Sequence, residues 1–226
     1  MNLSSLSFSG IRAARLAAAL GVVFLLHACA TPVAQRDYTA FRESRPRSIL
    51  VLPPVNQSPE IKAPLSFLAT ATAPLAESGY YVIPVTLAAE SFKQNGVTVA
   101  EEAHAIALDK LRQIFGADAA LYITITRFGA SYRLIDSVVE AAASAKLVDL
   151  RTGQELWSGQ AAVVLGNNNS SGGLVGALVS AIVNQIVNTL SDKSHDVARM
   201  ANYQMLSSGH PNAILFGPYH PKFGTD

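Results

Sequence analysis

The sequence predicts an α/β fold in which helices pack on one mixed β-sheet, and three observations predict it. An apolar run at 48–52 is followed by a helical pattern and a second short strand at 80–83, an order that builds parallel strand pairs. The segments 119–128, 141–150 and 155–165 then have the pattern of an antiparallel meander. Finally, 226 residues, half of them hydrophobic, are enough for one domain with a sizeable core.

The first 28 residues are typical of an export signal. Arg12 and Arg15 supply the positive charge, and an uncharged apolar run follows at 16–26. A membrane-spanning helix needs about 20 apolar residues, so this run is too short to span a bilayer and matches the apolar region of a signal peptide. We therefore expect residues 1–28 to be removed from the mature protein.

The apolar run ends at Leu26-His27-Ala28-Cys29, which resembles the lipobox of bacterial lipoproteins. In that motif an aliphatic residue and two small residues precede a cysteine that is lipidated, and His27 departs from the usual small residue. Cys29 is the only cysteine of the chain, so no intramolecular disulfide can form. Its position favours lipidation over an ordinary secretory signal that happens to contain a cysteine. In lipoproteins of bacteria with two membranes, a residue such as Ala30 after the cysteine favours the outer membrane.

Residues 29–47 are predicted to be the lipidated cysteine and a polar tether. The segment is mixed in composition and contains four arginines, which either contact lipid headgroups or are simply solvated. A single α/β domain is then expected over 48–226. Its first strand, 48–52, is wholly apolar and closed by two prolines, as buried central strands are.

The first helix of the domain is expected to start near Pro64, because proline suits the first helical turn, and to end before Gly79. The residues that recur at helical spacing, and so predict its buried stripe, are Leu65, Leu68, Thr72 and Leu75. After the strand at 80–83, Thr86 is expected to cap a short helix that continues through Lys93. A third helix is predicted over 104–115, with Leu108, Leu111 and Phe115 on one side.

Alternation of residue types in the sequence predicts which side chains of the meander strands share a face. In 119–128, Leu121, Ile123 and Ile125 alternate with polar or aromatic neighbours. The segment 149–154 contains Gly153 and is expected to be the hairpin between the strands 141–150 and 155–165. In the last strand Trp157, Ala161, Val163 and Leu165 share one face.

The remaining chain is predicted to be a Gly- and Asn-rich loop at 166–173, an uncharged helix at 174–190 and a second helix at 195–206. The uncharged helix has one apolar and one polar stripe, so we expect it to pack on the sheet. The tail from Gly209 is rich in proline and aromatic residues and is expected to lie over the domain as ordered coil.

Composition and motifs argue against several classes of function. Removal of Arg12 and Arg15 with the signal leaves 15 basic and 16 acidic residues, so no basic field for nucleic acid is present. His27, His104, His195, His210 and His220 show no metal-ligand spacing, and the chain has no nucleophile elbow or phosphate-binding loop. No metal, cofactor or catalytic residue is therefore expected.

Several motifs resemble a family of bacterial outer-membrane lipoproteins of unknown function that includes a surface antigen of pathogenic diplococci. The resemblance covers essentially the whole mature domain. It rests on SILVLPP at 48–54, PLAESGYYVIPV at 74–85, FKQNG at 92–96, FGADAALYI at 115–123, KLVDLRTG at 146–153 and GPY at 217–219. More distantly, the first strands and the hairpin are similar to the curli-secretion lipoprotein, the lipoprotein activators of penicillin-binding proteins, and the amino-terminal domain of the Tol periplasmic protein. Those relatives bind other proteins and supply no catalytic motif.

The resemblance implies a non-enzymatic lipoprotein that binds partners or assembles into an envelope secretion or transport complex. Its expected partners are the membrane, through the lipid, and other envelope lipoproteins or further copies of the chain. The expected location is the outer membrane of a Gram-negative bacterium, on the periplasmic face or at the cell surface. One alternative is a pore component in which 174–190 or 130–145 enters the bilayer. The other is an enzyme that acts on envelope polymers.

The lipobox-like motif predicts that the variant Cys29→Ser is neither lipidated nor attached to the membrane, because the thiol that receives the lipid is missing. Labelling of cells with radioactive palmitate, followed by fractionation, measures both effects. The wild-type chain serves as the positive control. Failure of the wild-type chain to incorporate palmitate would exclude the lipoprotein assignment of Cys29.

Overall fold

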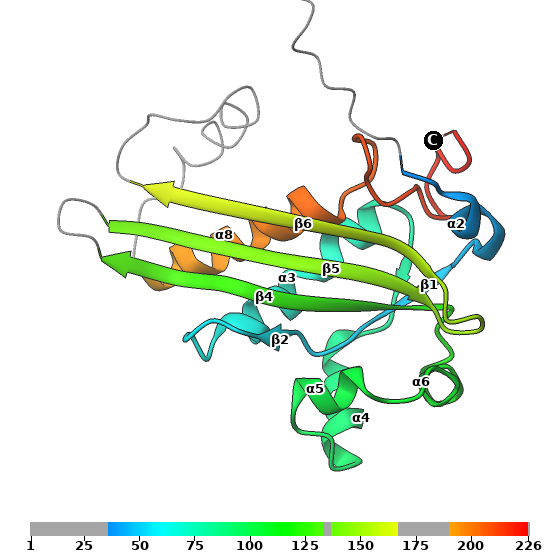
Figure 1. The fold of residues 1–226 in the computed structure, drawn as a ribbon, viewed down its shortest axis with the longest axis horizontal. Helices are drawn as coiled ribbons and strands as arrows, with labels where there is room; N and C mark the ends of the chain where they lie inside the picture. The colour runs from blue at the N-terminus through cyan, green and yellow to red at the C-terminus, as the bar shows by residue number, and fades with distance from the viewer. Residues whose placement is uncertain (1–35, 133–136, 167–189, 226) are drawn as a thin grey trace, which may run out of the picture. The chain divides into compact units, whose positions relative to one another are not determined.

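The computed structural model describes residues 36–132, 137–166 and 190–225, and these form the mixed α/β fold that the sequence predicts (Figure 1). The sheet has six strands, five of them in the order β3-β1-β4-β5-β6, while β2 pairs separately with β4. The strands are β1 (Ser48–Val51), β2 (Val55–Asn56), β3 (Tyr81–Val82), β4 (Ala119–Tyr132), β5 (Ser137–Asp149) and β6 (Glu155–Gly166). The expected helix at 174–190 lies outside the described residues.

The sheet is parallel at one side and antiparallel at the other. β1 runs parallel to both neighbours, with Ile49 opposite Val82 of β3 and Ala119 of β4. β4, β5 and β6 form the predicted antiparallel meander. At 14, 13 and 12 residues these three strands are about twice the usual length. Gly153 adopts the positive φ of 75° expected for the hairpin between β5 and β6.

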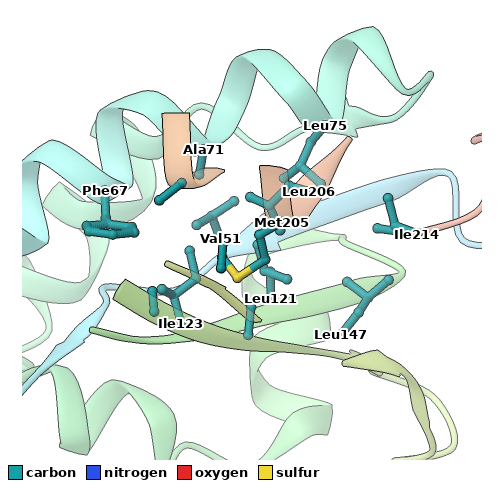
Figure 2. Packing of buried hydrophobic residues seen from close by; sticks show 14 of the residues in the cluster. Val51, Phe67, Ala71, Leu75, Leu121, Ile123, Leu147, Met205, Leu206 and Ile214 are labelled. Carbon is teal, nitrogen blue, oxygen red and sulfur yellow. The ribbon is translucent and has the colours of Figure 1, made fainter. Parts of the chain in front are cut away.

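In the described part of the chain two long helices cover one face of the sheet: α3 (Ala63–Glu77) and α8 (Leu190–Leu206). Figure 2 shows apolar side chains of both helices directed at those of β1, β4 and β5. The two layers are held together by Phe67, Ala71, Leu75, Met205 and Leu206 on the helices and by Val51, Leu121, Ile123 and Leu147 on the strands. Each large side chain of this kind stabilises the fold by about 1.5–3 kcal/mol.

Three short helices cover part of the other face: α4 (Val85–Gln94), α5 (Ala100–His104) and α6 (Leu108–Phe115). They build a second, smaller core against the side chains of β1, the start of β4 and the end of β5. The rest of that face carries small or polar side chains. Thr126, Ser144, Gln160, Ala162 and Val164 are exposed there.

Some predicted helix details are wrong. In α3 the buried stripe is centred on Phe67 and Ala71, whereas Leu65 is 71% exposed, because the larger Phe67 ring occupies the core position. The expected helix at 104–115 is two helices, α5 and α6, since Ala107 adopts an extended ψ of 136°. Thr86 makes no capping hydrogen bond, because α4 begins directly after Pro84.

The end of the predicted tether belongs to the folded unit, which starts at Asp37. Residues Thr39–Ser44 form the helix α2, and Phe41 is buried in the main core. The Tyr38 hydroxyl donates a hydrogen bond to the carbonyl oxygen of Ala213. The expectation of a tether running through Arg47 is therefore wrong for its last part. Apolar side chains of this segment pack on the domain, which composition alone did not reveal.

A buried carboxylate joins α2 to the β5–β6 hairpin. Asp149 is fully buried and accepts hydrogen bonds from the backbone N–H groups of Arg151 (2.7 Å) and Thr152 (2.9 Å). Its second oxygen accepts from the Ser44 hydroxyl and from the Arg151 guanidinium, the latter at 3.3 Å. Burial by itself raises the pKa of Asp149, but the hydrogen bonds from Ser44, Thr152 and Arg151 outweigh it and lower the pKa below its usual value.

Loss of the core contacts that Phe41 of α2 makes should destabilise the domain. Phe41→Ala removes a buried ring and is expected to lower the free energy of unfolding by about 3–5 kcal/mol. The matched control Leu65→Ala removes an exposed side chain and should change it by less than about 0.5 kcal/mol. Urea unfolding of the two variants measures both values. Equal effects would show that residues before β1 do not contribute to the folded unit.

The Asp149 network should make stability depend on pH with a defined sign. The unfolded carboxyl has a pKa of about 3.9 and the folded one a lower pKa. Its contribution is therefore complete above about pH 5 and disappears as the pH falls through the folded pKa.

Asp149→Asn should lower the free energy of unfolding by about 1.5–3 kcal/mol at neutral pH, the value of a hydrogen bond to a charged group. The difference from wild type should shrink as the pH is lowered. Asp109→Asn, at an exposed position, is the control and should have little effect at any pH. A difference for Asp149→Asn that stays constant from about pH 7 to about pH 3 would contradict this account.

Candidate functional site

The predicted lipidation site, Leu26, His27, Ala28 and Cys29, lies outside the described residues. The histidines show no metal-ligand spacing in the sequence, and the four that the structure describes are not gathered into a site. His195 and His210 are exposed on the surface, and the ring of His220 stacks on Phe216 at 4.1 Å between centroids. Among the described residues no three potential ligands approach closely enough to hold a metal ion.

His104 has a structural contact that accounts for its position. Its Nε2 lies 2.9 Å from the carbonyl oxygen of Pro53, and because a carbonyl only accepts, Nε2 carries the proton. The ring packs edge-on against Tyr122, with 5.1 Å between centroids. Burial lowers the pKa of His104, so the ring is neutral at physiological pH. These contacts tie α5 to the loop after β1 and give His104 a structural role.

A groove of about 320 Å³ lies between α2 and the C-terminal tail in the described part of the chain, and it is called here the α2–tail groove. Its walls come from segments at opposite ends of the domain. They are formed by Phe41, Arg42, Arg45 and Pro46 on the α2 side, by Leu215, Phe216, Pro218, Phe223 and Gly224 on the tail side, and by Tyr80.

The α2 side of the groove is shaped by the way the helix ends. Arg45 adopts a left-handed conformation, with φ at 45°, and its N–H donates to the carbonyl oxygen of Phe41. The Arg45 side chain then turns back, and its Nε donates to the carbonyl oxygen of Arg42 at 3.2 Å. The Arg42 guanidinium lies over the ring of Tyr38, 5.9 Å from its centroid. Two exposed guanidinium groups are thereby held at the groove.

The tail side is held by backbone contacts with the turn after α3. The N–H of Gly217 donates to the carbonyl oxygen of Ser78 at 2.7 Å, and the N–H of Tyr219 donates to the carbonyl oxygen of Gly79 at 3.1 Å. Gly79 has a φ of 90°, and a Cβ on Gly217 would overlap the Gly79 carbonyl. The Tyr80 hydroxyl also donates to the carbonyl oxygen of Leu215 at 2.6 Å. The Gly-Pro-Tyr motif at 217–219 is thus a docking segment for the tail.

The groove combines aromatic surface with positive charge. The Lys222 ammonium lies over the ring of Phe216, 5.9 Å from its centroid, and so adds a positive charge to those of the two arginines in the lining. Phe223 is 43% exposed, and Tyr219 is 67% exposed. Arginine and large aromatic residues are the types that dominate binding energy at protein interfaces. The arrangement can bind an anionic segment with apolar side chains.

The sequence predicted an ordered C-terminal tail and an arginine-containing segment before the first strand, but it did not predict that the two lie side by side. The ordered course of the tail is confirmed by the burial of Ile214 and Leu215. From its composition, segment 29–47 is predicted to be a tether. Nothing in that prediction indicates that its arginines lie next to the C-terminal tail. One signal was available in the pair Tyr38 and Phe41, whose spacing places two aromatic rings on one side of a helical turn.

Comparison with known proteins shows which family this chain resembles. The family described as "Putative lipoprotein GNA1162-like" matches residues 36–219. A relative from Neisseria meningitidis serogroup B, described as "Putative lipoprotein NMB1124/NMB1162", is 52% identical over 200 residues, which are 88% of this chain and 93% of the relative.

Two solved structures extend the comparison. The crystal structure of lipoprotein GNA1162 from Neisseria meningitidis is 55% identical and superposes with a TM-score of 0.53 over 64% of this chain and 100% of that one. A dodecamer of a PelC variant from Paraburkholderia phytofirmans is 13% identical, with a TM-score of 0.43 over 77% of this chain and 91% of that one. The match over residues 36–219 and the identity to the Neisseria relative show that the chain belongs to the GNA1162-like lipoprotein family.

Proposed function

We propose that this chain is an outer-membrane lipoprotein, anchored through lipidated Cys29, that binds a partner protein in the α2–tail groove and has no catalytic activity. The observation that carries the proposal is the groove itself, in which Arg42 and Arg45 stand beside aromatic and proline side chains. Membership of a lipoprotein family supports the anchor.

The distance along the chain from the anchor supports a role close to the membrane. Helix α2 begins at Thr39, ten residues after Cys29. At about 3.5 Å per extended residue, a lipid on Cys29 would keep α2 within about 35 Å of the bilayer. A partner that occupies the groove would therefore be held near the membrane surface.

The lining indicates what kind of segment fits. Guanidinium groups such as those of Arg42 and Arg45 are suited to carboxylate partners, because a guanidinium group can donate two parallel hydrogen bonds to one carboxylate. Phe216, Pro218 and Phe223 offer apolar surface to aromatic or aliphatic side chains. We expect an extended acidic segment that carries at least one large apolar residue. The described lining contains no histidine, cysteine, serine or carboxylate, which favours binding over catalysis.

The pore alternative receives no support from the part of the chain that the structure describes. No helix there is both long and apolar enough to cross a bilayer. Of the two segments considered for insertion, 174–190 lies almost wholly outside that part. The described portion of 130–145 belongs to β4 and β5.

A photo-crosslinking experiment tests the groove. The full-length chain carrying a photoreactive phenylalanine analogue at Phe223 should form a discrete crosslinked product with a protein in intact cells. The same analogue at Ile114, which is exposed on α6, is the positional control and should not form that product.

Charge reversal supplies the second arm of this test. Arg42→Glu combined with Arg45→Glu should lower the crosslinking yield from position 223 several-fold, because the groove then repels an acidic segment. Arg112→Glu, an exposed arginine on α6, is the control and should leave the yield unchanged. An unchanged yield in the groove variant, or crosslinking of position 223 to lipid alone, would contradict the proposal.

A further inference from the structure

Arg45, at the α2 side of the groove, has a backbone conformation that arginine rarely adopts. It follows the last residue of α2, with φ at 45° and ψ at 57°, in the left-handed region. Apart from glycines, the described residues include one further case of positive φ, Asn212 at 59°, and asparagine tolerates that region better than most residues. Glycine is the usual residue where a helix ends in this way.

The residue that follows Arg45 adds a second conformational restriction. Pro46 is buried and forms part of the groove wall. A proline restricts the backbone of the residue before it and favours an extended conformation there, because the proline ring crowds that residue. Arg45 is not extended. The turn from α2 into β1 therefore holds Arg45 against the preference of its own side chain and against that of its neighbour.

The turn itself does not require an arginine side chain. The hydrogen bond that closes it comes from the Arg45 backbone N–H, which donates to the carbonyl oxygen of Phe41 at 3.0 Å, and glycine can make the same bond. The side chain adds one exposed hydrogen bond, from Nε to the carbonyl oxygen of Arg42 at 3.2 Å. Water can replace either partner of an exposed bond, so its net contribution to stability is small. Backbone strain that the fold does not require is typical of functional sites.

We infer that Arg45 selects the ligand of the α2–tail groove by binding one of its carboxylates through the two terminal nitrogens of the guanidinium group. This role rests on the proposed function of the groove. Because Nε already donates to Arg42, the terminal nitrogens are the part of the group left for a ligand. Within the described residues Arg45 forms no ion pair that would occupy them. A guanidinium group in this position can donate two parallel hydrogen bonds to one carboxylate.

The other cations at the groove have aromatic partners. Arg42 lies over the ring of Tyr38 and Lys222 over the ring of Phe216, each 5.9 Å from the ring centroid. A cation in such a contact gives up part of this attraction when it turns towards a ligand. Arg45 can keep its bond through Nε while its terminal nitrogens bind. The peptide that fits therefore has a carboxylate at the α2 side of the groove and an apolar side chain at the tail side.

Substitution by glycine separates the strain at Arg45 from its role in binding. Arg45→Gly keeps the turn and removes the strain, so the purified full-length chain in a non-ionic detergent should melt about 2 °C higher than wild type. Arg47→Gly is the matched control, because it removes the same charge from a residue that lies outside the groove lining and has no positive φ. It should melt at or below the wild-type temperature, since glycine makes the unfolded chain more flexible.

Fluorescence anisotropy of the same chains measures ligand selection. The probe is a fluorescent peptide in which glutamate and phenylalanine alternate, and the control peptide has glutamine in place of glutamate. Wild type should bind the glutamate peptide about tenfold more tightly, the effect of one hydrogen-bonded charge pair. Arg45→Gly should remove this preference and leave the affinity for the glutamine peptide nearly unchanged, whereas Arg47→Gly should retain it. Arg45→Lys, which keeps the charge without the paired donors, should retain part of it.

The remaining outcomes also decide the question. A full glutamate preference in Arg45→Gly, or equal binding of both peptides by wild type, would overturn the role of Arg45 and leave the groove as a binding site. Equal loss of preference in Arg45→Gly and Arg47→Gly would overturn it too, because net charge would then be responsible. A lower melting temperature for Arg45→Gly than for Arg47→Gly would overturn it by showing that the turn requires the arginine. A wild-type chain that binds neither peptide would contradict the proposed function and, with it, this role.

Discussion

Three long antiparallel strands present one continuous apolar face, and the rest of the structure depends on covering it. In the described part of the chain α3 and α8 lie over most of that face, and their contact is the centre of the main core (Figure 2). The two helices are joined by a buried polar contact, since the Asn202 side chain donates to the carbonyl oxygen of Phe67 at 2.9 Å and to Thr70 at 2.8 Å. A buried amide of this kind restricts how the helices slide along each other.

The same requirement explains the groove. At the hairpin end of the strands the ring of Trp157 is buried under the start of the tail, and its indole N–H donates to the carbonyl oxygen of Asn212 at 3.1 Å. The tail then crosses to the turn after α3, while α2 packs beside it through Phe41. Two segments that close the core leave a groove where they meet, and the arginines on the α2 side stay at its surface because charged groups are costly to bury.

The second face of the sheet is covered unequally. The small helices α4, α5 and α6 protect β1 and its neighbours, whose residues are apolar on both sides, such as Leu50 and Val51. The far part of β4, β5 and β6 carries threonine, serine, glutamine and alanine on that face and needs no cover. The binding surface that we propose, the α2–tail groove, lies where the core no longer requires a neighbour.

Local pattern in the sequence determined the strands, the hairpin and the class of fold. Alternation of Leu121, Ile123 and Ile125 and the turn at Gly153 depend on residues close together in the chain, and the structure confirms them. The lipobox-like segment is also a local signal, and lipidation of Cys29 stays a prediction. Only the tertiary structure decided that α2 belongs to the domain, which face of α3 is buried, and that a groove exists. Those features depend on contacts such as Tyr38 with Ala213 and Tyr80 with Leu215, whose partners are 175 and 135 residues apart. Periodicity shows that a segment has an apolar side, but the shape of its distant neighbour decides which side chains fill the core.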